Sequence, residues 1–177
     1  RNIERNINDL ALKYKNSEEQ FCIENSCPFE LYKILVDQYG NNKAKAIIES
    51  FNSKSENSIR YNPNKVTKKE LLEILGNEAK ESTICEDSII IDKLDINSKY
   101  FKEGYYIIQD EASALVACSI GENIEEKYKI LDTCAAPGGK SLHIASKYLN
   151  STLISCDKYI HKLALIKDNI KRLGITN

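Results

Sequence analysis

The fold of this chain is decided by Asp132-Thr133-Cys134-Ala135-Ala136-Pro137-Gly138-Gly139-Lys140-Ser141, a stretch that combines a strand end, a tight turn and a helix start. The run before it, residues 128–131, is short and leans apolar, which is typical of a buried parallel strand. After it, apolar residues recur at helical spacing, at Leu142, Ile144, Ala145 and Leu149. Small loop residues let backbone N–H groups approach a ligand, and a helix start adds more N–H groups and a partial positive charge. We therefore expect a ligand-binding loop between a strand and a helix.

The end of this stretch also matches the end of a phosphate-binding Walker loop. That pattern requires a glycine five positions before Gly139, and this sequence has Cys134 there. Pro137 stiffens a loop that would have to curl around phosphates. A P-loop-like nucleotide hydrolase therefore remains an alternative with one mismatch, and an ordinary strand-to-helix turn is a second alternative. The dinucleotide pattern G-x-G-x-x-G is not matched.

A second strand–helix unit follows the loop. Residues 152–156 predict a strand, and Asp157 comes directly after it, at the edge where ligands bind in open α/β sheets. Asp157 stands 18 residues after Gly139, close to the ~20 expected for a ribose-binding acid. A helix N-cap is the alternative role for this carboxylate. The next helix has an apolar stripe, Leu163, Ile166, Ile170 and Leu173, and is expected to end before Gly174.

Residues 131–141 resemble the first motif of the RNA (cytosine-5)-methyltransferases of the NOL1/NOP2/Sun family, Leu-Asp-x-Cys-Ala-Ala-Pro-Gly-Gly-Lys-Thr/Ser, at every fixed position. Residues 104–113 resemble the family's Gly-x-x-x-x-Gln-Asp-x-Ala-Ser, and the bacterial RsmB/Sun branch is the most similar. The resemblance covers residues 27–177, more loosely outside these motifs. It implies a Rossmann-like α/β fold that binds S-adenosyl-L-methionine, with this chain carrying its front part. The residues implied to bind the cofactor are Cys134, Ala135, Ala136, Pro137, Gly138, Gly139, Lys140 and Asp157.

The resemblance also implies a reaction, the methylation of cytosine at carbon 5 in RNA, with 16S ribosomal RNA as the expected substrate. Carbon 5 becomes nucleophilic only after a thiolate adds to carbon 6. In the family two cysteines serve this chemistry, in motifs that we expect beyond residue 177, so no catalytic residue is assigned here. Cys134 is placed in the cofactor loop. Gln109 and Asp110 are further site candidates because the family places their segment beside the cofactor and the target base, while Asp110 also suits the N-cap of a helix over 111–119.

Three domains are expected. Residues 1–25 form a tail or linker that resembles the end of the helical, NusB-like domain of the RsmB/Sun branch; residues 26–100 form a small α+β RNA-recognition-like domain; and residues 101–177 form the N-terminal part of the methyltransferase domain. In the middle domain we expect two antiparallel helices between residues 27 and 51 and strands at 58–62 and 88–91. A capping box at Thr67-Lys68-Lys69-Glu70 opens a further helix.

The basic residues of the middle domain are candidates for contacts with RNA phosphates, the alternative being a solvated basic face: Arg60, Lys65, Lys68 and Lys69. Arg60 also belongs to Arg60-Tyr61-Asn62, which resembles the family's Arg-Val-Asn element.

The composition of the chain narrows the classes of protein and the kinds of site that remain. The 177 residues are 42% hydrophobic with a net charge of −1, which suits a folded chain and does not exclude a local RNA-binding surface. The six cysteines form no C-x-x-C pair, so neither a disulfide framework nor a metal site is expected. His143 and His161 are not grouped with acids or cysteines, and helix-surface or half-buried positions are expected for both. No apolar run could span a membrane, so we expect a cytoplasmic protein.

Arg1 is not a start residue, which suggests that the chain is a piece of a longer protein. A non-catalytic RNA-binding fragment is therefore a third alternative for its function.

Overall fold

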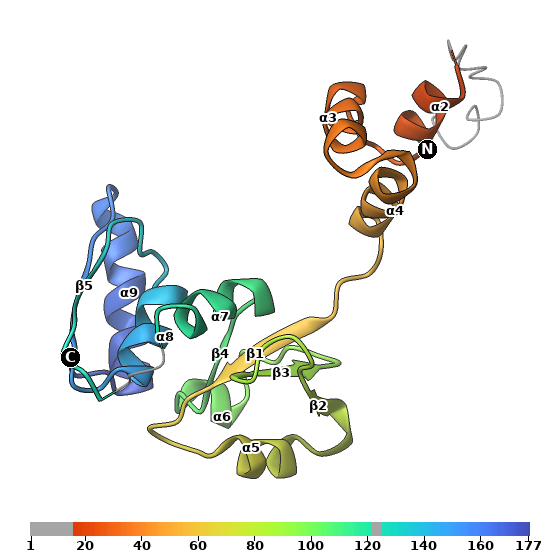
Figure 1. Cartoon of the computed structure of the whole chain (residues 1–177). Helices are drawn as coiled ribbons and strands as arrows, with labels where there is room; N and C mark the ends of the chain where they lie inside the picture. The colour runs from red at the N-terminus through yellow and green to blue at the C-terminus, as the bar shows by residue number, and fades with distance from the viewer. Residues whose placement is uncertain (1–15, 122–124) are drawn as a thin grey trace. The chain divides into compact units, whose positions relative to one another are not determined.

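A computed structural model describes residues 16–121 and 125–177, and the chain divides into two compact units, Arg1–Ser55 and Glu56–Asn177 (Figure 1). The described part of the first unit is helical, with α2 at Ser17–Glu24, α3 at Phe29–Tyr39 and α4 at Asn41–Phe51. Its core is formed by Cys22, Cys27, Tyr32 and Ile48. Gly40, at φ 77°, is the only residue between α3 and α4, which confirms the predicted helix pair. Residues 1–15 of the expected tail, 1–25, lie outside the described residues. Most of its remaining residues form α2.

The second unit begins with a four-stranded antiparallel sheet in the order β2-β3-β1-β4. Its strands are β1 at Asn57–Tyr61, β2 at Ala79–Glu81, β3 at Ser88–Ile91 and β4 at Tyr106–Ile108. One face packs Ile59, Ile89 and Tyr106 against Leu71 of α5, Lys68–Leu75, in one apolar core. The predicted capping box at the start of α5 is confirmed, because Thr67 and Glu70 exchange side-chain and backbone hydrogen bonds. Two short elements, η1 at Gly76–Glu78 and α6 at Lys99–Lys102, connect the strands.

The opposite face of the sheet carries the alternate residues of β1, Ser58 and Arg60, which are also buried. α7, Glu111–Cys118, contacts β1, and α8, Gly139–Lys147, contacts α7. α7 begins at Asp110, whose side chain accepts a hydrogen bond from the Ser113 N–H, as the sequence predicts. β1 is therefore covered on both faces, by the apolar core with α5 on one side and by α7 on the other. The strand thus links the sheet core to the helices α7 and α8.

The last part of the chain is a βαβ unit. β5 at Lys129–Asp132 runs parallel to β6 at Thr152–Ser155, α8 connects them, and α9 at Ile160–Leu173 follows. Each of these elements lies within three residues of its predicted position. The burial expected of the first strand is wrong on one face, however, because Leu131 and the neighbouring Ile154 are 60% and 57% exposed.

The boundary between the two compact units lies after Ser55, whereas the sequence predicts domain boundaries after residues 25 and 100. The division into three domains stays a prediction. The helix pair α3–α4 falls in the first unit, whereas β4, expected in the methyltransferase part, pairs with β1. A close approach also joins α9 to the segment before β4, because a Cβ on Gly104 would lie 2.0 Å from the Arg172 carbonyl oxygen. Among the described helices, none has the length and apolar character needed to cross a bilayer.

Candidate functional site

The loop between β5 and α8 is shaped by its two glycines. Gly138 has a left-handed backbone, φ 105°, and a Cβ there would lie 3.0 Å from Leu142 Cδ1. Its carbonyl accepts the Leu142 N–H at 2.8 Å, so α8 starts immediately after the loop. No side chain caps α8. The first-turn N–H groups, which have no carbonyl partner within a helix, therefore face the loop and make it suited to an oxygen acceptor or an anion.

Asp132, the last residue of β5, holds both ends of this loop. Its Oδ1 accepts the Cys134 N–H at 3.1 Å, and its Oδ2 accepts the Ser141 hydroxyl at 2.5 Å. The sequence placed Asp132 at the start of the motif without assigning it a role. A carboxylate at the carboxyl end of a parallel strand is the signal that could have identified it.

Asp157 connects β6 to the same loop. Its Oδ2 accepts the Ala136 N–H at 3.3 Å, and its Oδ1 accepts the Tyr159 N–H at 3.0 Å. These two bonds, with the one from Tyr159 the stronger influence, hold the pKa of the Asp157 carboxyl below its ordinary value. The N-cap of α9 is Tyr159, so the alternative role of Asp157 as that cap is wrong.

A cavity of about 210 Å³ lies over the loop. Six of the eight residues predicted to bind the cofactor line it: Cys134, Ala135, Ala136, Pro137, Gly139 and Lys140. Gly138 and Asp157 are not in this lining; Gly138 shapes the turn, and Asp157 lies against the loop through its bond from Ala136. Gln109 and Asp110, from the segment between β4 and α7, also line the cavity, and Asp132 and Ser113 are lining residues that the sequence did not identify.

Arg60 is not on a basic surface, which corrects the expectation that it contacts RNA phosphate or solvent. It is 1% exposed, its Nε donates to Gln109 Oε1 at 2.8 Å and its Nη1 donates to Ser146 Oγ at 3.4 Å. Burial lowers its pKa to about 10, so the guanidinium remains charged near neutral pH. Of the other predicted phosphate contacts, Lys65 and Lys69 are exposed, while Lys68 pairs with Glu81 at 2.9 Å.

His143 is likewise buried, not on a helix surface, and it is grouped with an acid and a cysteine. Its Nε2 lies 2.9 Å from Asp87 Oδ2, which also accepts from Cys118 Sγ at 3.3 Å and Lys147 Nζ at 3.2 Å. The hydrogen bond from His143 is the main reason that the pKa of Asp87 lies well below its ordinary range. The sequence could not show this group, because Asp87 and His143 are 56 residues apart.

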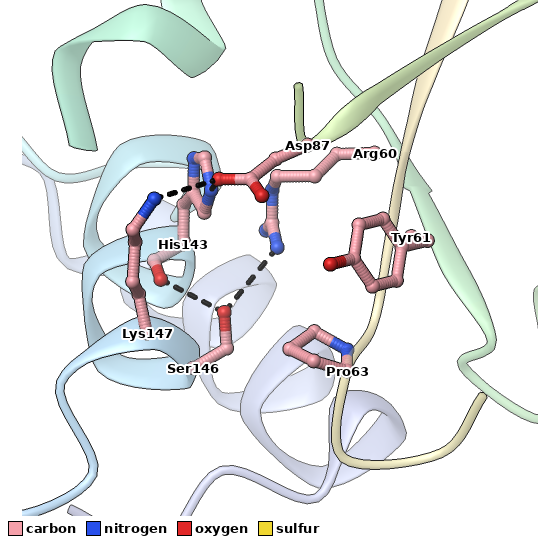
Figure 2. Close-up of a pocket in the computed structure, with 7 residues that line it drawn as sticks. All are labelled: Arg60, Tyr61, Pro63, Asp87, His143, Ser146 and Lys147. Atoms are coloured by element: carbon pink, nitrogen blue, oxygen red, sulfur yellow. Dashed lines mark hydrogen bonds and ion pairs between the residues drawn. The ribbon is translucent and has the colours of Figure 1, made fainter. Parts of the chain in front are cut away.

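This group lies beside a second cavity of about 220 Å³, between β1 and α8, which Arg60, Tyr61 and Pro63 also line (Figure 2). The possible ligand atoms of Asp87, Cys118 and His143 lie within 4.8 Å of one another, a spacing that a metal ion could use. The Lys147 ammonium, however, already binds the same Asp87 oxygen and lies 3.8 Å from Cys118 Sγ. The geometry therefore favours a half-buried cluster around the Asp87–Lys147 ion pair, in which Asp87, next to β3, holds His143 and Lys147 of α8.

Comparison with known proteins gives consistent matches. Residues 121–177 match the family described as 16S rRNA methyltransferase RsmB/F. The chain is 37% identical to the probable ribosomal RNA small subunit methyltransferase B of Bacillus subtilis (strain 168), over 86% of this chain and 35% of that protein. It is 31% identical to the ribosomal RNA small subunit methyltransferase B of Vibrio vulnificus (strain YJ016), over 96% of this chain and 42% of that protein. The chain thus spans less than half the length of these relatives.

Among solved structures, the crystal structure of PH0851 superposes with a TM-score of 0.79 at 27% identity, covering 95% of this chain and 40% of that one. This likeness confirms the predicted Rossmann-like α/β fold.

Proposed function

The chain belongs to the family of 16S rRNA methyltransferases RsmB/F, and we propose that it binds S-adenosyl-L-methionine over the loop after β5 for the methylation of cytosine at carbon 5 in 16S ribosomal RNA. The observation that carries this proposal is the cavity lined by the loop, Gln109 and Asp110. We also propose that the enzyme acts in the cytoplasm, together with its proposed rRNA substrate.

The residues of the cavity fit this cofactor. The N–H groups of Cys134, Ala135, Ala136 and Gly138 donate within the protein, so the donors for a ligand come from the uncapped first turn of α8, which begins at Gly139. Each oxygen of Asp157 accepts one backbone hydrogen bond and keeps a lone pair with which it can accept from a ribose hydroxyl. We therefore assign the ribose to Asp157 and the amino-acid part of the cofactor to the loop and the start of α8.

The bound cofactor supplies a methyl group on a positively charged sulfur. Around it, the carboxylates of Asp110 and Asp132 lie in the cavity wall together with Lys140, so the wall carries charges of both signs, which suit a ligand that has a cationic and an anionic group. The loop also lacks the Walker glycine, so a nucleotide triphosphate fits the site less well.

We assign no covalent nucleophile within these 177 residues. Cys134 is exposed at the rim of the cavity and its backbone N–H is held by Asp132, which suits a structural position in the loop. We propose that the thiolate that adds to carbon 6 of cytosine belongs to a part of the protein outside this sequence. The exposed Lys65 and Lys69 remain the candidates for RNA phosphate contacts in the sheet unit.

Calorimetry on the purified protein tests the cofactor assignment. S-adenosylhomocysteine is expected to bind, and ATP with magnesium is expected to bind much more weakly or not at all. Tighter binding of ATP would favour the nucleotide-hydrolase alternative. Transfer of a tritiated methyl group from S-adenosylmethionine to unmodified 16S RNA by the full-length protein tests the reaction, and RNA binding without transfer would favour the non-catalytic alternative.

A further inference from the structure

Gln109 connects the antiparallel sheet to the loop cavity, because it is hydrogen-bonded to β1 and also lines the cavity. Its backbone is tied to β1 twice, because its N–H donates to the Ser58 carbonyl at 3.3 Å and its carbonyl accepts the Ser58 hydroxyl at 2.7 Å. Gln109 lines the loop cavity, and its side-chain amide lies beside Gly139. The position of this side chain is therefore set by the sheet and not by the loop.

Arg60 determines which way the Gln109 amide faces. The Arg60 Nε–H can only donate, so the atom 2.8 Å away must be the oxygen, Oε1. The amide nitrogen, Nε2, is then turned to the other side, where it lies 3.6 Å from the position of a Cβ on Gly139. The guanidinium is itself held, because Nη1 donates to Ser146 of α8 (Figure 2).

The Gln109 Nε2 group is buried and has no hydrogen-bond partner among the described residues. A buried donor without an acceptor destabilises a protein, so such groups call for an explanation. This one lies beside the start of α8, whose first-turn N–H groups have no side-chain cap. Two kinds of donor, an amide side chain and a helix N-terminus, therefore converge beside Gly139, and together they suit an anionic acceptor.

We propose that Gln109 donates through Nε2 to the carboxylate of the amino-acid part of the bound cofactor, and that Arg60 is a positioning residue that keeps this donor turned toward the cavity. The proposal rests on the proposed function, which supplies the ligand. It gives Arg60 a role in ligand binding from inside the antiparallel sheet, without contact with RNA.

The central test is Gln109→Glu. The new carboxylate still accepts from Arg60, so the melting temperature is expected to stay the same or rise, but the group facing Gly139 can no longer donate. The dissociation constant of S-adenosylhomocysteine is expected to rise about 10- to 100-fold, the range for losing one hydrogen bond to a charged group. Methylthioadenosine, which has no amino-acid part, is expected to bind the variant and the wild-type protein equally. Equal loss for both ligands, or no loss for either, would overturn the proposal.

Arg60 is tested by variants that leave the ligand side of the cavity unchanged. Arg60→Met frees the Gln109 amide to rotate and is expected to weaken S-adenosylhomocysteine selectively, whereas Arg60→Lys keeps one donor and should restore part of the affinity. Asn57→Ala is the matched control, because it removes a side-chain hydrogen bond of β1, to the Asp92 carbonyl, that does not involve Gln109: unchanged affinity for both ligands is expected. If Arg60→Met binds both ligands like the wild-type protein, Arg60 has no positioning role. A wild-type protein that binds neither ligand would instead contradict the proposed function.

Discussion

Asp157 accepts a hydrogen bond from the backbone N–H of Ala136 at 3.3 Å, and this bond joins the residue after β6 to the loop after β5. The same carboxylate accepts the Tyr159 N–H at the start of α9. One side chain therefore fixes the loop, the edge of the two-stranded sheet and the entry to the last helix. Its position is set by the parallel register, in which Asp132 lies opposite Ser155.

The first prediction concerns this carboxylate. Asp157→Ala is expected to weaken S-adenosylhomocysteine binding by about tenfold or more, because the loop loses an anchor and the proposed ribose acceptor is removed. Asp157→Asn is the matched variant: it keeps an oxygen that can accept one backbone hydrogen bond and should lose less affinity. Calorimetry of both variants at neutral pH measures the effect. Unchanged affinity in Asp157→Ala would remove Asp157 from the site.

The loop and its neighbours could be predicted from the sequence because their signals are local. The capping box at Thr67, the N-cap at Asp110 and the glycine turn before α8 each depend on residues within a few positions of one another. Such contacts form wherever the short sequence occurs, and the surrounding fold has little influence on them.

The roles of Arg60 and His143 could not be predicted, because their partners are distant in sequence. Arg60 binds Gln109 and Ser146, which are 49 and 86 residues away. From the sequence alone, an arginine on a strand is expected to point to the surface. Arg60 is buried only because α7 and α8 cover that face of the sheet. β2 was missed for a similar reason, since Ala79-Lys80-Glu81 has no strand propensity of its own and pairs because β3 lies beside it.

The second prediction concerns the close approach of Gly104 to α9. Gly104→Ala is expected to reduce the free energy of unfolding by about 3 kcal/mol or more, since a Cβ would collide with the Arg172 carbonyl in addition to the cost of a positive φ. Gly174 is the matched control, because it also has a positive φ, 72°, in the left-handed region, and a Cβ there would meet only Lys65 Cε, at an ordinary contact distance of 3.7 Å. Gly174→Ala should therefore cost only about 1–2 kcal/mol. Urea denaturation of the two variants measures the difference, and equal losses would contradict the close approach.

The third prediction is a pH dependence of stability that comes from His143. Burial lowers its pKa below the ordinary 6.5, against the opposing effect of Asp87. As the pH falls through about 6.5 the unfolded chain takes up a proton that the folded protein does not, so the free energy of unfolding decreases, by at most about 1.4 kcal/mol per pH unit for one proton. Asp87, whose pKa is also lowered, loses its stabilising effect only at still lower pH, below the ordinary 3.8.

The test compares melting temperatures between pH 7.5 and 5.5. The wild-type protein should melt at a lower temperature at pH 5.5, and the slope should be flatter in His143→Gln, which cannot take up a proton. His161→Gln is the control, because His161 is the only other histidine and is exposed on α9. A slope that changes in His161→Gln and not in His143→Gln would contradict the assignment.

The last prediction separates the two roles that a cysteine in this loop could have. Cys134→Ala is expected to change both S-adenosylhomocysteine affinity and methyl transfer to RNA by less than about threefold, the size of an ordinary surface substitution. The reason is that Asp132 binds the backbone N–H of residue 134, which alanine retains, while the thiol is exposed at the rim of the cavity. Asp132→Ala provides the contrast. It removes the acceptor for both Cys134 and Ser141 and should weaken cofactor binding by about tenfold or more, because both ends of the loop are released. Tritium transfer by the full-length protein measures the reaction: if it disappears in Cys134→Ala while cofactor affinity is kept, Cys134 is the nucleophile and its assignment to the cofactor loop is wrong.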